Sequence, residues 1–528
     1  MNNIDPVILG DMSAVRDKGL TYVHQNYFWP VSDDDFSDFS RFLYDEYMDL
    51  VKNENNIEIS NIATVEFSFI AQLLPIFHYN YVREYSSEKR FELIVGKESQ
   101  EFLNPNWDSI KHYYSRLSYP YSDIVRMIRR FVRNIVFNKH LSFIQIFNGL
   151  LFGSDEISVG SNDSLKKDFI SNQNKFFDHV DWTYLMKSDT VVPDKKIFEY
   201  RNYFVNNIIE PYLQKLKECD SLFVKNIDFD NIKNVWSTRI SEAYLLYLNL
   251  KSSSVSSKLL ITEISKPINK LITVAYQSKG CEVYGFNHGH ESVIKISKLV
   301  FSTNIAQCRN LIVPTNGTKA RYQKHYSKTC GVMEVSTRFI SVHSKRMYKI
   351  YLKNIENKLD DDINTIMIMG YPCNSNRYLC SKGLFFYQQL DLEYQIISIL
   401  KEKNKRIIYK AHPERLSEIK GLFDHLVDDI VVDSFENVWQ KADLLIFTYS
   451  ETTTFGYALT TNLPIVLLDA EKDMRDLDDM KLLDKRVVRI CTEVNRNTQI
   501  NFNKKTLIRA ITQSNYDISY DYVEAVYK

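Results

Sequence analysis

Five short apolar runs in the C-terminal part of the chain constrain its fold more than any other feature. The runs are Thr365–Met369, Arg406–Lys410, Asp429–Asp433, Asp443–Thr448 and Pro464–Asp469. Apolar residues follow one another in each run without regular polar alternation, and segments with helical spacing separate the runs. A parallel sheet that is covered on both faces requires continuous apolar strands of this kind. The alternation of strand and helix therefore predicts an α/β fold of the doubly wound class.

A less regular alternation precedes these runs, from about residue 257 onwards. Its strand-like runs are Lys258–Ile264, Cys281–Phe286, Lys298–Ser302 and Asn310–Pro314. Earlier residues favour helices and irregular segments, with no visible strand–helix alternation and a loop-rich stretch at 151–200. A chain of 528 residues has room for two or three domains. We therefore predict a mostly helical N-terminal region at 1–200, a first Rossmann-like domain at 201–345 and a second at 346–528.

Charge and cysteine content narrow the class of protein. The sequence holds 66 Lys and Arg against 66 Asp and Glu, which argues against a general nucleic-acid-binding protein because such proteins carry a basic excess. The seven cysteines include no CxxC pair, so free thiols in a reducing compartment are expected. Residues 1–6 lack the basic start and apolar core of a signal peptide, and no run approaches the roughly 18 apolar residues of a spanning helix. These features predict a cytoplasmic protein.

A lysine ends the second apolar run and a histidine follows it, in Tyr409-Lys-Ala-His-Pro-Glu414. Lys410 and His412 are two positions apart at a strand end, so both side chains can point to the same side. Lysine supplies a point charge for a phosphate oxygen, and histidine supplies a directional donor that becomes cationic when protonated. His-Pro also occurs as a plain strand-to-helix turn. Because the pair stands in a regular strand–helix unit, we favour a phosphate site here, with His412 as a catalytic candidate.

Hydroxyl side chains follow the fourth apolar run, in Thr448-Tyr-Ser-Glu-Thr-Thr-Thr454. Hydroxyls and free backbone N–H groups at a helix start form a ready anion site, so Ser450, Thr452 and Thr453 are expected to bind a phosphate. The alternative is plain capping of the helix by Ser450 or Thr452, which is compatible with phosphate binding. The residues expected to contact the nucleotide or its ribose are Glu451, Glu436 and Gly370.

The strand-like run Cys281–Phe286 is followed directly by Asn287-His-Gly-His-Glu291. Two histidines and a carboxylate within five positions could bind a metal, but this spacing is a weak signal without a further ligand cluster, and we predict no metal site. A substrate-binding or general-base role, facing the other domain across a cleft, is favoured instead. The candidates for this base are His288, His290, Glu291 and, at the end of the preceding strand, Glu263.

A basic amphipathic segment lies within the N-terminal region, in a helix expected from about residue 122 to 147. Its basic face holds Arg126, Arg129, Arg130 and Arg133, and its apolar face holds Ile124, Ile128, Phe131 and Ile135. Such a helix can lie on an anionic membrane, which would give peripheral contact with the inner face of a membrane through the arginines. The alternative is a surface helix with its apolar face in the core. We favour this alternative because most amphipathic helices are of that kind.

Taken together, these motifs resemble those of the GT-B glycosyltransferases, which combine two Rossmann-like domains. Lys410-Ala-His-Pro413 resembles the K-x-H-P motif of bacterial CMP-sialic acid and Kdo-type transferases, and Tyr449–Thr453 resembles their paired-hydroxyl motif. Asn287-His-Gly289 is similar to the Q-H-G motif of surface-polysaccharide transferases, with Asn in place of Gln. CDP-glycerol polymerases of teichoic acid synthesis share an H-G, an H-P and a hydroxyl motif. The resemblance covers about Ser257–Asp469.

The resemblance implies a role for each motif. His412 would contact the donor phosphate and protonate it as it leaves. The residues that would hold the same phosphate are Lys410, Ser450 and Thr452. A group of the first domain would act as base on the acceptor hydroxyl, and Glu263, His288, His290 and Glu291 stay open for this role.

The resemblance predicts a metal-independent glycosyltransferase that needs no cofactor besides its nucleotide-sugar donor. The donor would be a CMP-activated acidic sugar (sialic acid, Kdo or another nonulosonate), and the acceptor would be a bacterial surface glycan such as capsule, O-antigen or lipooligosaccharide. Three alternatives stay open: a CDP-glycerol or polyol phosphotransferase, a UDP- or GDP-sugar transferase, and a non-catalytic glycan- or nucleotide-binding protein. The chain lacks GxxxxGK(S/T), and lacks GxGxxG in a strand–helix setting, so neither a P-loop nucleotidase nor a dinucleotide dehydrogenase is supported.

Overall fold

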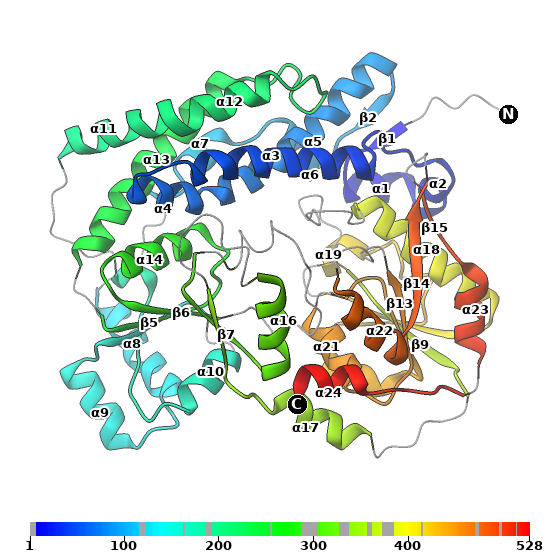
Figure 1. Ribbon diagram of the computed structural model, residues 1–528. Helices are drawn as coiled ribbons and strands as arrows, with labels where there is room; N and C mark the ends of the chain where they lie inside the picture. The colour runs from blue at the N-terminus through cyan, green and yellow to red at the C-terminus, as the bar shows by residue number, and fades with distance from the viewer. Residues whose placement is uncertain are drawn as a thin grey trace.

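Two β-sheets lie side by side beneath a layer of helices in the computed structural model of the chain (Figure 1). The structure describes residues 7–115, 123–161, 164–185, 193–253, 256–286, 305, 307–326, 337–355, 362–371, 385–412, 415–450, 452–469, 475–495, 499–513 and 515–528. Side chains are described for all of these residues except 123–127 and 183. Parallel strands dominate both sheets, so the α/β class predicted from the sequence is confirmed.

The second sheet holds all five apolar runs of the C-terminal part as strands. Its strands are β9 (Thr365–Met369), β10 (Arg406–Lys410), β11 (Asp429–Val431), β12 (Leu444–Phe447), β13 (Ile465–Asp469), β14 (Val488–Val494) and β15 (Ile500–Phe502). They pair in the order β11-β10-β9-β12-β13-β14-β15, and β15 alone is antiparallel to its neighbour. Numbered along the chain, the six parallel strands have the order 3-2-1-4-5-6. The five predicted strands are confirmed, while β14 and β15 are additional.

Side chains of this sheet alternate between two buried layers. Ile366 and Ile368 of β9 belong to the same core cluster as α18 (Phe386–Glu402), whereas Met367 and Met369 belong to the cluster on the other face. The helices on that other face are α20 (Phe435–Val438), α21 (Thr453–Leu459), α22 (Leu477–Arg486) and α24 (Asp521–Tyr527), while α19 (Leu416–Ile419) and α23 (Lys504–Thr512) complete this half. Burial on both faces explains why the runs are continuously apolar.

The first sheet begins earlier in the chain than the sequence indicates. Its strands are β3 (Glu156–Val159), β4 (Asp178–His179), β5 (Lys258–Ile261), β6 (Glu282–Phe286), β7 (Asn310–Val313) and β8 (Arg338–Ser341), and its helices are α10 (Ser164–Ser171), α14 (Pro267–Ser278) and α16 (Asn316–Tyr326). They pair in parallel in the order β4-β3-β5-β6-β7-β8. Strands β5, β6 and β7 confirm the predictions, and the run Lys298–Ser302 lies outside the described residues.

Strands β3 and β4 contradict the loop-rich character expected of residues 151–200. Because β3 pairs directly with β5, the first sheet crosses the predicted domain limit at residue 200. Local pattern could not reveal this pairing, since the helices of residues 194–252 separate β3 and β4 from β5 along the chain.

Helices from two separate parts of the chain form the layer above the sheets (Figure 1). They are α1 (Met12–Lys18), α2 (Leu20–Asn26), α3 (Asp33–Lys52), α4 (Ile57–Val65), α5 (Phe67–Lys89), α6 (Lys97–Leu103), α7 (Trp107–Lys111), α11 (Asp194–Phe204), α12 (Glu210–Lys217) and α13 (Phe229–Ser252), with a π-helical turn at Val205–Ile209 and the short parallel pair β1 (Val7–Leu9) and β2 (Glu92–Ile94). Helices α12 and α13 contact α3, α4 and α7. They thus belong with the N-terminal helices, although the predicted limits 201–345 place them in the first Rossmann-like domain.

One helical stretch among the described residues, Ile57–Lys89, is long and apolar enough to cross a membrane. Within its most apolar window, 83% of the residues are buried inside the protein. The central helix of a folded domain has the same length and composition, so this stretch is weak evidence for a membrane span.

Aromatic side chains join the helical layer to the second sheet. Trp29 stacks on Phe385 just before α18, with ring centroids 4.4 Å apart. The indole Nε1–H of Trp29 donates to Nε2 of His78 on α5 at 2.8 Å. His78 must therefore be neutral at Nε2, and burial lowers its pKa to about 3.

Acid is expected to weaken this junction. The unfolded chain takes up a proton at His78 below about pH 6.5, whereas the folded protein does so only near its lowered pKa, so stability is lost as pH falls from about 6.5 towards 3. Through His78 alone, the free energy of unfolding should fall by about 2 kcal/mol between pH 7 and pH 5. Urea unfolding at both pH values measures this drop. The variant His78→Gln keeps an acceptor for Trp29 but has no histidine to protonate. Its free energy of unfolding should therefore fall by about 2 kcal/mol less than that of the wild type between pH 7 and pH 5. Equal falls in both proteins would contradict the expectation.

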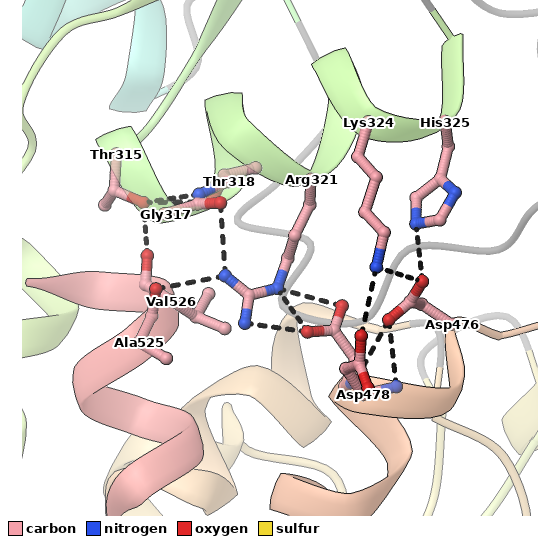
Figure 2. Close-up of polar contacts among 11 residues, drawn as sticks. Thr315, Gly317, Thr318, Arg321, Lys324, His325, Asp476, Asp478, Ala525 and Val526 are labelled. Atoms are coloured by element: carbon pink, nitrogen blue, oxygen red, sulfur yellow. Dashed lines mark hydrogen bonds and ion pairs between the residues drawn. The ribbon is translucent and has the colours of Figure 1, made fainter.

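A polar contact joins the two sheet-bearing halves, which α17 (Arg346–Asn354) connects along the chain. Arg321 of α16 donates from Nε to both carboxylate oxygens of Asp479 of α22 at 2.8 and 2.9 Å. Its Nη1 donates to the carbonyl oxygen of Ala525 of α24 at 3.0 Å (Figure 2). A Cβ atom added at Gly317 would lie 2.1 Å from that same carbonyl oxygen. Glycine therefore permits α24 to approach α16 closely.

Helix α8 (Asp123–Phe137) packs in the opposite way to the favoured prediction. Its exposed apolar side chains are Ile128, Phe131, Val132, Ile135 and Val136. On its other side Asn134 is fully buried and donates to Asp178 at 3.0 Å. The ion pairs of the basic face are Arg130–Asp178 and Arg133–Asp181. Arg129 is exposed, and the side chain of Arg126 lies outside the described residues. The polar face thus contacts the protein body, and the expectation of a buried apolar face is wrong.

Candidate functional site

The two motifs of the second half leave the sheet close together. Strands β10 and β12 flank β9, and their register places Lys410 and Phe447 beside Met369 at the carboxyl end of β9. In the order 3-2-1-4-5-6, the strand sequence reverses between β9 and β12. Ligands of open α/β sheets bind at the carboxyl ends of strands at such a switch point. The segments that follow Lys410 and Phe447 therefore reach the edge where the sequence predicts a ligand.

Lys410 is a largely buried cation at this edge. The residue is 8% exposed, and its Nζ donates to the carbonyl oxygen of Ala411 at 2.8 Å. Burial lowers the pKa of the ammonium, while the exposed carboxylates of Glu436 and Asp433 act to raise it. A buried ammonium gains from a nearby anion, because burial removes the water that would otherwise solvate the charge. A phosphate oxygen is an anion of the right kind.

Arg475 is a site residue that the sequence analysis missed. It lies beyond β13 and is 6% exposed. Its Nη2 donates to the hydroxyl of Ser450 at 2.7 Å, and its Nη1 lies 2.6 Å from Oδ2 of Asp469. The Ser450 hydroxyl, predicted to bind phosphate, is thus held by a guanidinium, which is itself well suited to phosphate. A lone arginine in the polar stretch after the fifth apolar run gave no sign of this pairing.

A buried carboxylate beneath the same edge was also missed. Glu393 of α18 and Arg415 are fully buried, and Arg415 Nη1 lies 2.8 Å from Glu393 Oε1. The Tyr409 hydroxyl donates to Oε2 of Glu393 at 2.7 Å, and Arg415 also donates to the carbonyl oxygen of Tyr371. The network therefore fixes the segments that follow β9 and β10 against α18. The only signal in the sequence was the position of Glu393 among apolar residues in the middle of a predicted helix. Helical periodicity alone does not distinguish such a buried acid from an exposed one.

Gly370 has a packing role at the end of β9. A Cβ atom added there would lie 2.3 Å from the Tyr409 hydroxyl oxygen. The hydroxyl of Tyr449 donates to the Gly370 carbonyl oxygen at 3.4 Å, and its ring contacts that of Tyr371 edge-on at 4.5 Å. Glycine thus allows the Tyr409 ring to pass close beneath the backbone. A contact of Gly370 with a nucleotide stays a prediction.

The hydroxyl residues that follow Ser450 serve the start of α21. Thr452 is the N-cap, and its Oγ1 accepts from the backbone N–H of Phe455 at 3.0 Å, which confirms the capping interpretation. Thr453 is the first residue of this seven-residue helix and is exposed. Glu436 is exposed on α20. The roles of these three residues towards phosphate and ribose stay predictions.

His412 lies at the same edge, one residue beyond the buried Ala411. It is partly buried, and its carbonyl oxygen accepts from the backbone N–H of Arg415 at 2.9 Å. Four further predicted site residues lie outside the described part of the chain, namely Glu451, His288, His290 and Glu291. Their predicted roles are untested.

Glu263 stands at the switch point of the first sheet. Numbered along the chain, that sheet has the order 2-1-3-4-5-6, and Glu263 follows β5 where β5 neighbours β3. Its backbone φ is 53°, a left-handed value that is strained for a residue with a side chain and is frequent at functional sites. Oε1 of Glu263 accepts from Nζ of Lys266 at 2.8 Å. The carboxylate is therefore paired with Lys266 and lies near the ligand edge of its own sheet.

The described residues thus include two buried cations, Lys410 and Arg475, at the edge of one sheet and a carboxylate, Glu263, at the edge of the other. Within the described ranges, no group of three or more His, Cys, Asp or Glu is placed to hold a metal ion. In comparisons with known proteins, the chain matches no protein-family model, and no curated protein matches it in sequence.

Proposed function

We propose that the protein is a GT-B-type glycosyltransferase that moves a sugar from a CMP-activated acidic donor to a surface glycan. The observation that carries the proposal is the position of Lys410 and of the segment after Phe447 on either side of β9. This is the switch point of a sheet with the order 3-2-1-4-5-6. The first sheet is also parallel, with the order 2-1-3-4-5-6, and supports an interpretation as two Rossmann-like domains.

Two buried cations suit the phosphate of the donor. Lys410 is the last residue of β10, and Arg475 reaches the same edge through Ser450. In such a site, preorganised positive charge stabilises the negative charge that develops on a departing nucleotide. A CMP leaving group carries that charge on its single phosphate, so Lys410 would act on it directly and Arg475, which is paired with Asp469, would act through the Ser450 hydroxyl.

The proposed reaction is a displacement at the anomeric carbon of the donor sugar. A bond forms between this carbon and an acceptor hydroxyl oxygen, and the bond between this carbon and the phosphate oxygen breaks. CMP leaves with the bonding electron pair and accepts a proton from His412. Glu263, the candidate base among the described residues, takes the proton of the acceptor hydroxyl.

Turnover of a donor panel tests this proposal. The purified protein is incubated with CMP-sialic acid, CMP-Kdo, CDP-glycerol, UDP-glucose or GDP-mannose, with and without glycan acceptors, and nucleotide release is measured. We expect release of CMP from a CMP-sugar. Glu263→Gln should lower acceptor-dependent turnover by roughly 100- to 10,000-fold, because a general base contributes on that order.

A matched control is Glu282→Gln, which changes an exposed carboxylate at the opposite, amino end of β6 and should leave turnover unchanged. Turnover of CDP-glycerol alone would contradict glycosyl transfer in favour of polyol phosphate transfer. Turnover of UDP-glucose or GDP-mannose alone would contradict the CMP donor. A His412→Ala variant with unaltered nucleotide binding and turnover would contradict the role given to His412.

A further inference from the structure

An exposed apolar surface on the first-sheet half has no part in the proposed reaction. This surface, the α8–α9 face, consists of Ile128, Phe131, Val132, Ile135, Val136, Phe143, Ile144, Phe147, Leu151 and Phe152. These are ten of the 21 large apolar side chains that are exposed among the described residues. Single exposed apolar residues are ordinary, but a group concentrated on two adjacent helices marks an interaction surface.

The inner side of α8 holds this helix firmly against the sheet. Asn134 donates to Asp178 and accepts from the backbone N–H of His179 at 2.7 Å. Phe137 is buried and stacks on the His179 ring, with centroids 4.6 Å apart. The polar side of α8 is thus bonded to β4, and its apolar side is fixed towards solvent.

Helix α9 (Phe143–Phe152) extends the same surface. Ile146 is buried, and a Cβ atom added at Gly149 would lie 2.3 Å from the Phe176 ring, so this side of α9 packs closely on the body. On the other side Phe143 is 78% and Phe152 84% exposed. Ten helical residues span about 15 Å, half of the roughly 30 Å hydrocarbon core of a bilayer. The helix is too short to cross a membrane but is long enough to lie in its interface.

Basic residues lie beside the α8–α9 face. Residues 123–153 hold five Lys and Arg against one Asp, and two of the five, Arg130 and Arg133, pair with Asp178 and Asp181 of the protein body. Arg129 and Lys139 are exposed. Exposed apolar side chains beside an excess of basic residues match an anionic lipid surface, which supplies acyl chains and negative headgroups together.

We propose that the α8–α9 face docks the protein on an anionic lipid surface. The two helices lie in the plane of the interface, the apolar side chains enter the acyl region, and the exposed Arg129 and Lys139 contact headgroups. The contact differs from the one expected from the sequence, because apolar side chains rather than the four arginines of α8 supply most of it. Figure 1 places α9 at the outer margin of the molecule, on the side away from the second sheet, so docking leaves that sheet uncovered.

Co-sedimentation with vesicles tests the docking. The full-length protein should sediment with vesicles of phosphatidylcholine mixed with phosphatidylglycerol, and far less with phosphatidylcholine alone. The double variant Phe143→Gln/Phe152→Gln should bind at least about tenfold more weakly, since it removes two apolar side chains from the acyl region. Lys139→Gln should weaken binding to anionic vesicles by about fivefold. The control Phe198→Gln alters an exposed phenylalanine of α11 and should bind like the wild type.

A second measurement does not depend on the stability of the double variant. In Phe147→Trp, the new indole should shift its fluorescence to shorter wavelength on anionic vesicles. The proposal would be overturned if the wild type sediments equally with and without anionic vesicles. An unshifted Phe147→Trp spectrum in the presence of these vesicles would also overturn it. So would a wild-type dimer in light scattering that Phe143→Gln/Phe152→Gln converts to monomer, because the face would then join two copies of the chain.

Discussion

Replacing Glu393 by Gln is expected to lower the free energy of unfolding by about 3–5 kcal/mol. The carboxylate and the Arg415 guanidinium are both fully buried and 2.8 Å apart. Removing one charge leaves the other in the interior without its counter-charge, which costs far more than an exposed pair is worth. The Tyr409 hydroxyl also loses its charged acceptor. Urea unfolding of the wild type and of Glu393→Gln measures the difference.

Two controls separate the ion pair from other effects at α18. Glu402→Gln alters an exposed acid at the end of the same helix and should change stability by no more than about 0.5 kcal/mol. The double variant Glu393→Leu/Arg415→Met removes both charges and should recover most of the loss, because replacing a whole buried pair by apolar residues is often neutral. A Glu393→Gln protein as stable as Glu402→Gln would show that the pair does not hold this edge together.

Replacing Lys410 by Met should weaken binding of the donor nucleotide by roughly 10- to 100-fold. A hydrogen bond between a charged donor and a phosphate is worth about 1.5–3 kcal/mol, which corresponds to this loss. Folding should not suffer, because the variant removes a largely buried ammonium whose pKa burial lowers. Nucleotide titration by calorimetry and urea unfolding measure the two effects separately.

The pH dependence distinguishes charge from shape at Lys410. Since its pKa is lowered, the ammonium is lost at a lower pH than that of an ordinary lysine, so nucleotide binding should weaken as pH rises through that lowered pKa. Lys410→Met should lack this dependence. Lys441→Met, at an exposed position just before β12, should bind like the wild type. A Lys410→Met protein with wild-type affinity would remove Lys410 from the phosphate site.

The strands of the second sheet were predicted closely because burial on both faces makes each strand a continuous apolar run in the sequence. Thr365–Met369 and Arg406–Lys410 match β9 and β10 to the residue. The first sheet was predicted only in part, since β4 has only two residues and β3 alternates polar with apolar residues instead of forming a continuous apolar run. Their place beside β5 is decided by packing across the chain.

Helix α8 illustrates a different limit. Periodicity shows which side chains share a helix face, and the apolar and basic faces of α8 are as expected. It does not show which face meets the body, and the bonds of Asn134 and Arg130 to Asp178 decide this. The apolar face of α8 is therefore exposed, and it is this exposure that the proposed lipid contact explains.

In the candidate site, too, only features that lie within one strand–helix unit were predicted from the sequence. Lys410 and His412 could be placed at a strand end from the sequence, because the motif lies within one strand–helix unit. The bonds of Arg475 to Ser450 and of Arg415 to Glu393 join residues 25 and 22 positions apart, and only the fold brings them together. Thr452 was proposed both as cap and as phosphate ligand, and the structure confirms the cap.

Calorimetric titration with CMP, CDP, UDP and GDP tests most directly whether the carboxyl edge of the second sheet binds the phosphate of a cytidine nucleotide. CMP should bind the wild-type protein more tightly than UDP or GDP, and Lys410→Met should weaken its binding by roughly 10- to 100-fold. Binding of UDP or GDP alone, or equal CMP affinity in the wild type and in Lys410→Met, would contradict a CMP site at this edge.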